Sequence, residues 1–199
     1  MNNPGFIDQN RPVQQKYYEL LDRMDQESMS QQKKIKLMRR LIDQDLHFLD
    51  PYLYLHEIYQ YENKPKKANK ILVEAFDHAI DLVTNKKGEW PEALYWGWIE
   101  NRHIIRTILN KALTEWDQAN NEQAIKLLRK LFKTNPQDNI GARHYILGIR
   151  LGFTLVGFED RFNKGGYYNN DLNEWFDEHA PKFPKEFDWW FKEMESQGL

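Results

Sequence analysis

Residues 50–83 have the sequence DPYLYLHEIYQYENKPKKANKILVEAFDHAIDLV, in which two helical patterns flank a break at Asn63-Lys64-Pro65. Apolar side chains recur at three- and four-residue intervals on both sides of this break, as expected for helices that bury one face. Asp50-Pro51 marks the start of the first helix, because aspartate can accept hydrogen bonds from the first turn and proline needs no amide partner there. This stretch therefore predicts a helical hairpin.

Helical periodicity extends over most of residues 12–117. Tyr17, Leu20 and Met24, for example, lie three and four positions apart and share one helix face. Alternating polar and apolar stretches, which would indicate strands, are nearly absent. Breaks between the predicted helices fall at residues 28–30, 50–51, 63–65, 87–88 and 120–121. We therefore predict an all-α protein of roughly seven to nine helices that pair as antiparallel hairpins.

Apolar positions also repeat at a spacing of 34 residues. The matched pairs are Tyr18 and Tyr52, Leu21 and Leu55, Met38 and Leu72, and Leu41 and Ala75. A second-helix pattern returns as Ala124, Leu128 and Leu131 and is closed by Pro136. Over residues 15–155 this period and spacing resemble the tetratricopeptide repeat (TPR), a unit of two antiparallel helices.

The resemblance to TPR proteins implies a short right-handed α-solenoid, whose first helices line a concave, peptide-binding face. The expected hairpins pair Tyr18 with Met38, Tyr52 with Leu72, and Leu113 with Leu128. Small residues at Ala68, Ala75 and Ala124 are expected at tight contacts between helices, and a helix over residues 140–154 is expected to open a fourth unit. The TPR-like domain is predicted to span residues 12–158.

Two segments depart from the repeat. Residues 83–104 form an insertion with three tryptophans, and we predict one continuous helix from Pro91 to Trp116. In such a helix Trp96 and Trp98 cannot share a face, because two residues rotate it by about 200°. Residues 159–199 contain a loop at 163–170 and two short aromatic helices. We expect this tail to fold back as a cap, since a solenoid otherwise exposes the apolar face of its last repeat.

The composition favours a cytoplasmic protein without cofactors. The 199 residues carry a net charge of −2 and no cysteine, so nucleic acid is not expected as a partner and thiolate or disulfide chemistry is excluded. No apolar stretch is long enough to span a membrane, and the start of the chain lacks the pattern of a secretory signal. The oligomeric state is left open by the sequence.

The resemblance places the candidate binding residues on the first helices of the repeats. These partner-binding candidates are Glu57, Tyr61, Arg102, Arg106, Arg143 and Arg150. The four arginines could form a basic stripe for carboxylates or phosphates, because guanidinium offers paired donors. A structural alternative exists for Asn135-Pro136 and the residues after it: proline stops one helix, Asp138 or Asn139 caps the next, and Gly141 permits close packing. Arg143 would then pair with an acidic neighbour.

An all-helical enzyme is the competing hypothesis. Glu100 and His103, or Glu74 and His78, lie at spacings that suit metal ligation, although a full site needs further ligands. Arg40 and His47 resemble the arginine–histidine spacing of some all-helical ribonucleases, in which such a pair could protonate a phosphodiester. No complete catalytic or metal-binding set is evident. We therefore predict a scaffold that binds a protein or peptide, with a metal-dependent or ribonuclease-like enzyme as the alternative.

Overall fold

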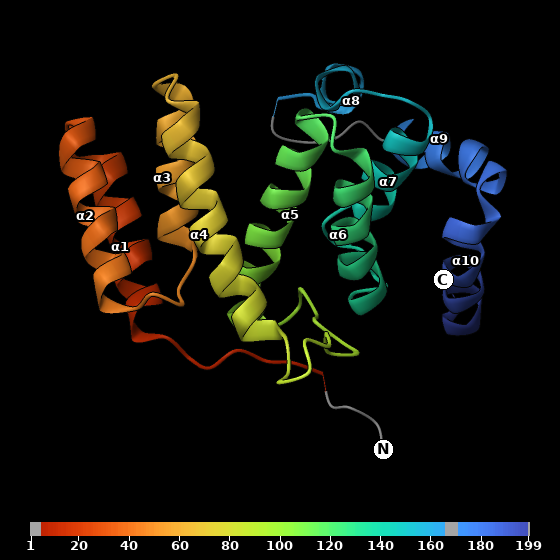
Figure 1. Ribbon diagram of the computed structural model, residues 1–199, viewed down its shortest axis with the longest axis horizontal. Coiled ribbons are helices and arrows are strands. Elements are labelled where there is room, and N and C mark those ends of the chain that lie inside the picture. Colours follow the sequence, from red (N-terminus) through yellow and green to blue (C-terminus); the bar gives the residue numbers. More distant parts are fainter. Residues whose placement is uncertain (1–4, 166–170, 199) are drawn as a thin grey trace. The chain divides into compact units, whose positions relative to one another are not determined.

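The computed structural model describes residues 5–165 and 171–198, and Figure 1 shows its helices. The described α-helices are α1 (Pro12–Gln26), α2 (Gln31–Gln44), α3 (Asp50–Tyr61), α4 (Pro65–Val83), α5 (Arg102–Asp117), α6 (Asn121–Thr134), α7 (Ala142–Arg150), α8 (Leu155–Phe162), α9 (Asp171–His179) and α10 (Pro184–Gln197). There are also two short 3-10 helices, η1 (Ile99–Asn101) and η2 (Ala180–Lys182). The described residues contain no strand. The all-α prediction is confirmed, with more helices than expected. Part of the predicted loop over 163–170 lies outside the described residues.

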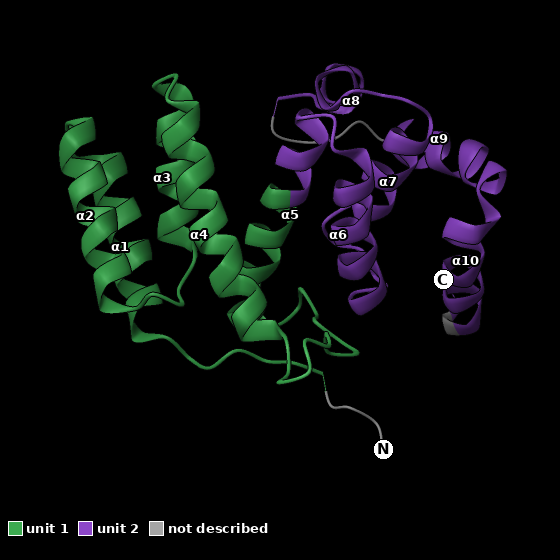
Figure 2. Cartoon of the chain, viewed as in Figure 1, with its two compact units in different colours: residues 1–111 green, residues 112–199 purple. Residues whose placement is uncertain are grey.

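The chain divides into two compact units, coloured separately in Figure 2. Unit 1 comprises residues 1–111 and contains α1 to α4 and the first part of α5. Unit 2 comprises residues 112–199 and contains the end of α5 and α6 to α10. The TPR-like domain over residues 12–158 remains a prediction, because this division concerns compactness alone.

In unit 1 the helices pack on their neighbours in chain order. The principal contacts join α1 to α2, α2 to α3 and α3 to α4, which Figure 1 shows side by side. The first two predicted hairpins are thus present. Ser30 caps α2 by accepting a hydrogen bond from the Lys33 amide at 3.3 Å. In unit 2 the principal partner of α6 is α7, so the predicted pairing of Leu113 with Leu128 is not among the main helix contacts.

The α3–α4 hairpin closes over small residues as expected. Ala68 and Ala75 are buried, and Ala124 is buried in unit 2. The buried ring of His56 hydrogen-bonds through Nδ1 to the carbonyl oxygen of Ala68 at 2.9 Å, which joins α3 to α4. The predicted cap at Asp50 is wrong: Asp50 is already the first residue of α3, and its carboxylate binds Arg106 instead.

The predicted continuous helix from Pro91 to Trp116 is also wrong. Residues 91–98 are not helical, and α5 begins only at Arg102. The N-terminal segment occupies this region: the Phe6 amide donates to the carbonyl oxygen of Ala93 at 2.8 Å, and Asn101 donates to the carbonyl oxygen of Phe6 at 2.9 Å. These long-range bonds replace the helical hydrogen bonds that local sequence alone would favour.

Aromatic rings form the core of unit 2. Phe158 lies within 5.6 Å of the Trp116 ring and 5.5 Å of the Tyr145 ring, measured between centroids. A Cβ at Gly148 would come within 2.8 Å of Phe158, so α7 approaches this cluster at Gly148. Close packing was predicted instead for Gly141, which has a φ of +72° in the turn before α7. The helix is also shorter than the predicted residues 140–154.

The C-terminal tail packs against the other helices of unit 2. Phe176 of α9 and Phe187 of α10 are buried, and their ring centroids lie 5.1 Å apart. Phe132 of α6 lies 4.8 Å from the Trp189 ring, while Trp190 donates from Nε1 to the carbonyl oxygen of Pro136. Residues 171–196 therefore belong to the folded core of unit 2.

Candidate functional site

Three helices of unit 1 meet through polar contacts between the predicted first helices. Arg106 of α5 binds Asp50 of α3 through two hydrogen bonds, one of them from Nε at 3.0 Å. Tyr54 of α3 donates to the sulfur of Met24 in α1 at 3.5 Å. Burial raises the pKa of Tyr17 in α1, and the charge of Asp50 adds to this shift. Helices α1, α3 and α5 are therefore neighbours within unit 1.

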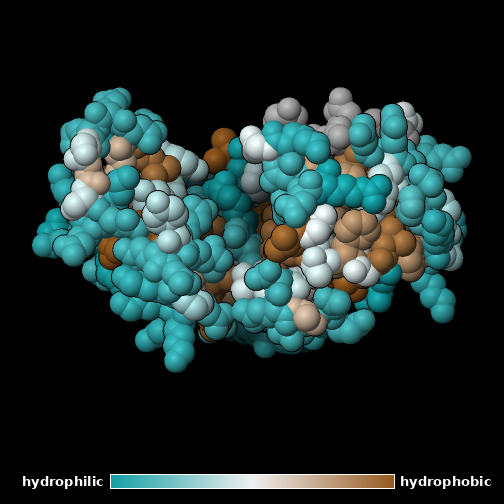
Figure 3. Space-filling view, turned by 90° about the horizontal axis from the view of Figure 1, so that it is seen from above, coloured by the Kyte–Doolittle hydropathy of each residue, from teal (hydrophilic) through white to brown (hydrophobic). Residues whose placement is uncertain are grey.

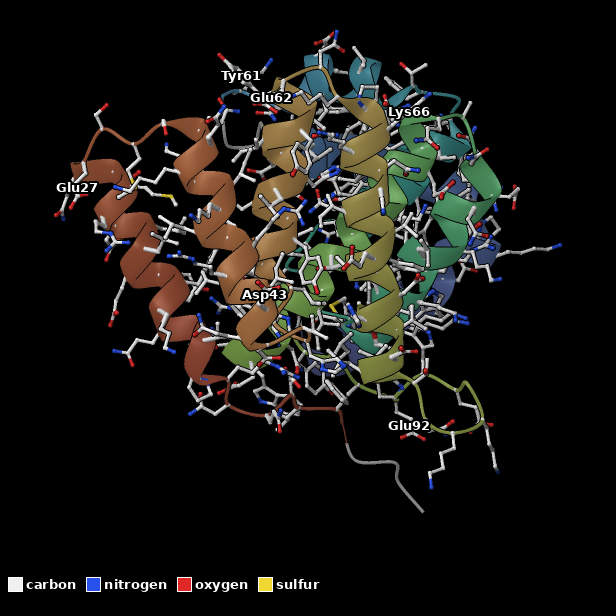
Figure 4. The ribbon with its side chains drawn as sticks, turned by 60° about the vertical axis from the view of Figure 1, so that its left-hand side comes forward. Glu27, Asp43, Tyr61, Glu62, Lys66 and Glu92 are labelled. Carbon is white, nitrogen blue, oxygen red and sulfur yellow. The ribbon has the colours of Figure 1, made fainter. Side chains whose placement is uncertain are left out.

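A groove lies between α2, α3 and the turn that joins α1 to α2. Its volume is about 340 Å³, and its lining residues are Met29, Gln31, Lys34, Tyr54, Glu57, Ile58 and Tyr61. We call it the Tyr61 groove. Glu57 and Tyr61 were both predicted to bind a partner, and the structure brings them together here. The side chain of Tyr61 is 87% exposed, and Figure 4 shows it at the end of α3 beside the α3–α4 turn.

Glu57 supplies a carboxylate to the Tyr61 groove. Tyr54, Glu57, Ile58 and Tyr61 follow the i, i+3, i+4, i+7 spacing that aligns side chains along one helix face. Partial removal from water raises the pKa of Glu57, and the charge of neighbouring His56 opposes this only in part. No ion pair to Glu57 occurs in the described part of the chain. The groove therefore presents a carboxylate between two tyrosines, and Lys34 also lines the groove without forming an ion pair to Glu57.

Arg102 and Arg106 lie over a single tryptophan of the insertion. Their guanidinium carbons are 5.2 and 5.9 Å from the Trp96 ring centroid, a separation typical of cation–π contacts. Arg102 also donates from Nε to the carbonyl oxygen of Trp96 at 3.1 Å. Trp98 contacts Tyr95 instead, with centroids 5.3 Å apart. The two tryptophans thus have different surroundings, although they lie in an irregular segment and not in a helix.

The other two predicted arginines, in unit 2, make intramolecular contacts. Arg143 binds Asp138 at 3.0 Å and lies over the Trp190 ring at 4.9 Å. Arg150 binds Glu186 at 2.7 Å. Arg106, Arg143 and Arg150 are therefore each neutralised by a carboxylate of their own unit, as the structural alternative for Arg143 anticipated.

Asp138 caps α7 as that alternative proposed. Its carboxylate accepts hydrogen bonds from the Ala142 amide at 2.7 Å and the Arg143 amide at 3.0 Å. Burial raises the pKa of Asp138 to about 6, against the opposing effects of Arg143 and the two amides. Burial likewise lowers the pKa of His144 to about 3. His144 is therefore neutral near pH 7 and binds Asn173 through Nε2 at 3.1 Å.

The residues of the enzyme hypothesis take part in packing. The His103 ring is buried, where Nδ1 accepts from the Leu49 amide at 3.2 Å and Nε2 lies 2.9 Å from Asp8. The His78 ring lies 5.3 Å from the His47 ring. Within residues 5–165 and 171–198, no three His, Asp or Glu side chains are grouped as metal ligands would be.

A buried polar network in unit 1 has no counterpart among the patterns of the sequence. Asp8 binds His103 and Arg11, and Arg11 also binds Asp45 at 2.9 Å. Asn101 accepts from the Asp8 amide at 3.0 Å. Asp8 and His103 are separated by 95 residues, and no local spacing links them. This network fixes the N-terminal segment against the start of α5.

Comparisons of the chain with family models, curated proteins and solved structures gave no match. In the described ranges, no helix combines the length and apolar character that crossing a membrane requires.

Proposed function

We propose that this chain is a TPR-like module that binds a segment of another protein at the Tyr61 groove of unit 1. The proposal rests mainly on one observation: a tyrosine that is 87% exposed stands beside a carboxylate that has no ion pair among the described residues, in a groove of about 340 Å³. Tyrosine is enriched at the centres of protein interfaces, because it combines a large apolar ring with a polar hydroxyl.

The arrangement of helices in unit 1 supports a repeat-like architecture. The α1–α2 and α3–α4 hairpins follow each other, and their first helices contact through Met24 and Tyr54. Arg106 links α3 to α5 in the same way. Such contacts between successive first helices are expected of a solenoid. We infer that the short right-handed solenoid implied by the TPR resemblance begins in unit 1.

The chemistry of the Tyr61 groove favours a partner with a basic side chain. A lysine or arginine would neutralise Glu57, and the faces of Tyr54 and Tyr61 attract cations. Arg102 lies over Trp96 on α5, which is another of the predicted first helices. Arg106 on the same helix is already bound to Asp50. A role of Arg143 and Arg150 in partner binding remains a prediction. Their ion pairs within unit 2 leave fewer of their hydrogen-bond donors for a partner.

Peptide selection tests this function. Random peptides displayed on phage are selected on the full chain, and the affinities of the selected peptides are measured by fluorescence anisotropy. We expect the peptides to contain lysine or arginine next to apolar residues. The double variant Tyr61→Ala with Glu57→Gln should weaken binding at least about tenfold, as loss of central interface residues does.

Tyr95→Ala provides the matched control, because Tyr95 is a 41% exposed tyrosine of unit 1 that does not line the Tyr61 groove. Selected peptides that bind wild type and the Tyr61/Glu57 variant equally would show that the binding surface lies elsewhere.

A further inference from the structure

Positive charge is segregated in two segments of unit 1. Residues 28–42 and 63–73 contain no aspartate or glutamate. They contain nine cations, five in the first segment and four in the second: Lys33, Lys34, Lys36, Arg39, Arg40, Lys64, Lys66, Lys67 and Lys70. The first segment includes most of α2, and the second forms the start of α4, where Figure 4 labels Lys66. The net charge of −2 for the whole chain conceals this local excess.

Three of these cations converge on a second groove between α2 and α4. The groove has a volume of about 320 Å³ and is lined by Arg39, Tyr59, Lys67, Lys70, Ile71 and Glu74. We call it the Tyr59 groove. Arg39 donates to the Tyr59 hydroxyl at 3.1 Å, and the Lys67 ammonium lies 5.9 Å from the Tyr59 ring centroid. Tyr59 thus orients cations from two different helices.

The cations of the Tyr59 groove are not neutralised by the protein. In the described residues, no ion pair joins Arg39, Lys67 or Lys70 to a carboxylate, although Glu74 lines the same groove. All three side chains belong to exposed residues. Figure 3 shows a largely hydrophilic surface on the left-hand part of the molecule, which belongs to unit 1. An anionic ligand would therefore not have to displace an internal carboxylate from these side chains.

We propose that the Tyr59 groove binds a short acidic segment of a partner protein. Lysine and arginine side chains bind carboxylates through charge-assisted hydrogen bonds. Tyr59 and Ile71 add an apolar floor that suits peptide side chains between the acidic ones. The site goes beyond the Tyr61 groove, because it lies between α2 and α4 and selects the opposite charge.

The charges that flank the two basic segments in the sequence favour a short acidic peptide over a nucleic acid. The preceding helix α1 carries Glu19, Asp22 and Asp25, and the second half of α4 carries Asp77 and Asp81. In the sequence, the first three carboxylates precede the first basic segment, and the last two follow the second basic segment. A long polyanion binds through many phosphate contacts, and the chain outside the two basic segments is net negative and would repel the rest of such a ligand. A short peptide would avoid this repulsion.

Fluorescence anisotropy on the full chain tests the proposal. The probe is a short labelled peptide of alternating Glu and Leu, and its Gln–Leu analogue measures the contribution of charge. We expect the Gln analogue to bind at least about tenfold more weakly, and the affinity of the Glu peptide to fall as salt is added. Lys67→Ala with Lys70→Ala should raise the Kd of the Glu peptide roughly tenfold.

Lys86→Ala with Lys87→Ala is the matched control, because it removes the same charge from an exposed loop of unit 1. Equal binding of the Glu and Gln peptides would overturn the proposal, as would equal effects of the two lysine pairs. A single-stranded oligonucleotide of the same charge serves as competitor. If it binds more tightly than the Glu peptide and loses affinity in the Lys67/Lys70 variant, the groove is a nucleic-acid site instead. These results are independent of binding at the Tyr61 groove.

Discussion

Asp8 is a buried carboxylate in the N-terminal segment that bonds to Arg11, Asn101 and His103. Burial alone would raise the pKa of Asp8, but hydrogen bonds from His103 and Arg11 and the charge of Arg11 together lower it below its usual range. The His103 Nδ1 accepts from the Leu49 amide, so its proton is on Nε2 and points toward Asp8. Removing the carboxylate charge would leave Arg11, itself buried, with Asp45 as its one charged partner in the described part of the chain.

We predict that Asp8→Asn lowers the free energy of unfolding at pH 7 by about 3 kcal/mol, in the range for breaking a buried ion pair. Because the folded pKa of Asp8 is depressed, its contribution is present above the unfolded value of 3.8 and is lost as the pH falls through the folded pKa. The gap between wild type and variant should therefore narrow in acid. Urea unfolding at several pH values measures this difference in the free energy of unfolding. The control is Asp25→Asn, because Asp25 is exposed. A gap that widens in acid would contradict this account.

The individual helices and hairpins could be predicted from local sequence. The irregular segment before α5 and the long-range polar contacts could not. The periodicity of residues 50–83 is sufficient to predict α3 and α4, because each buries one face. Glu57 and Tyr61 were found together because they lie one turn apart on a single helix. The false helix over residues 91–101 and the missed Asp8–His103 contact share one cause. Both depend on bonds between segments more than 85 residues apart, which no local pattern encodes.

The approach of α7 to α8 supplies a prediction at the level of elements. Gly148→Ala would place a methyl group 2.8 Å from Phe158 and 3.2 Å from Trp116. We expect a loss of about 1–3 kcal/mol in stability, as for other overpacked cores. The matched control is Gly97→Ala, since nothing lies within 4 Å of a Cβ at Gly97. Thermal denaturation followed by circular dichroism compares the two, and equal melting temperatures would be incompatible with the close contact.

For the molecule as a whole, the tail is part of the core of unit 2. Truncation after Gly165 would remove Trp175, Phe176 and Phe187, all buried, and would expose the rings against which they pack. Each well-buried aromatic contributes about 1.5–3 kcal/mol, so their joint loss approaches the net stability of a domain. We expect the truncated chain to aggregate or to retain helix without fixed packing. Near-UV circular dichroism and dye binding would detect this state, and a native spectrum would exclude a core role for the tail.

Tyr59 and Tyr61 lie two positions apart on α3, so the helix turns them about 200° away from each other, and they line different grooves. A substitution at the exposed Tyr61 leaves the contacts of the buried Tyr59 with Arg39 and Lys67 in place. Natural selection can therefore alter the Tyr61 groove without affecting the Tyr59 groove. One short helix lines both of the proposed binding sites, and the more exposed of the two is free to evolve separately.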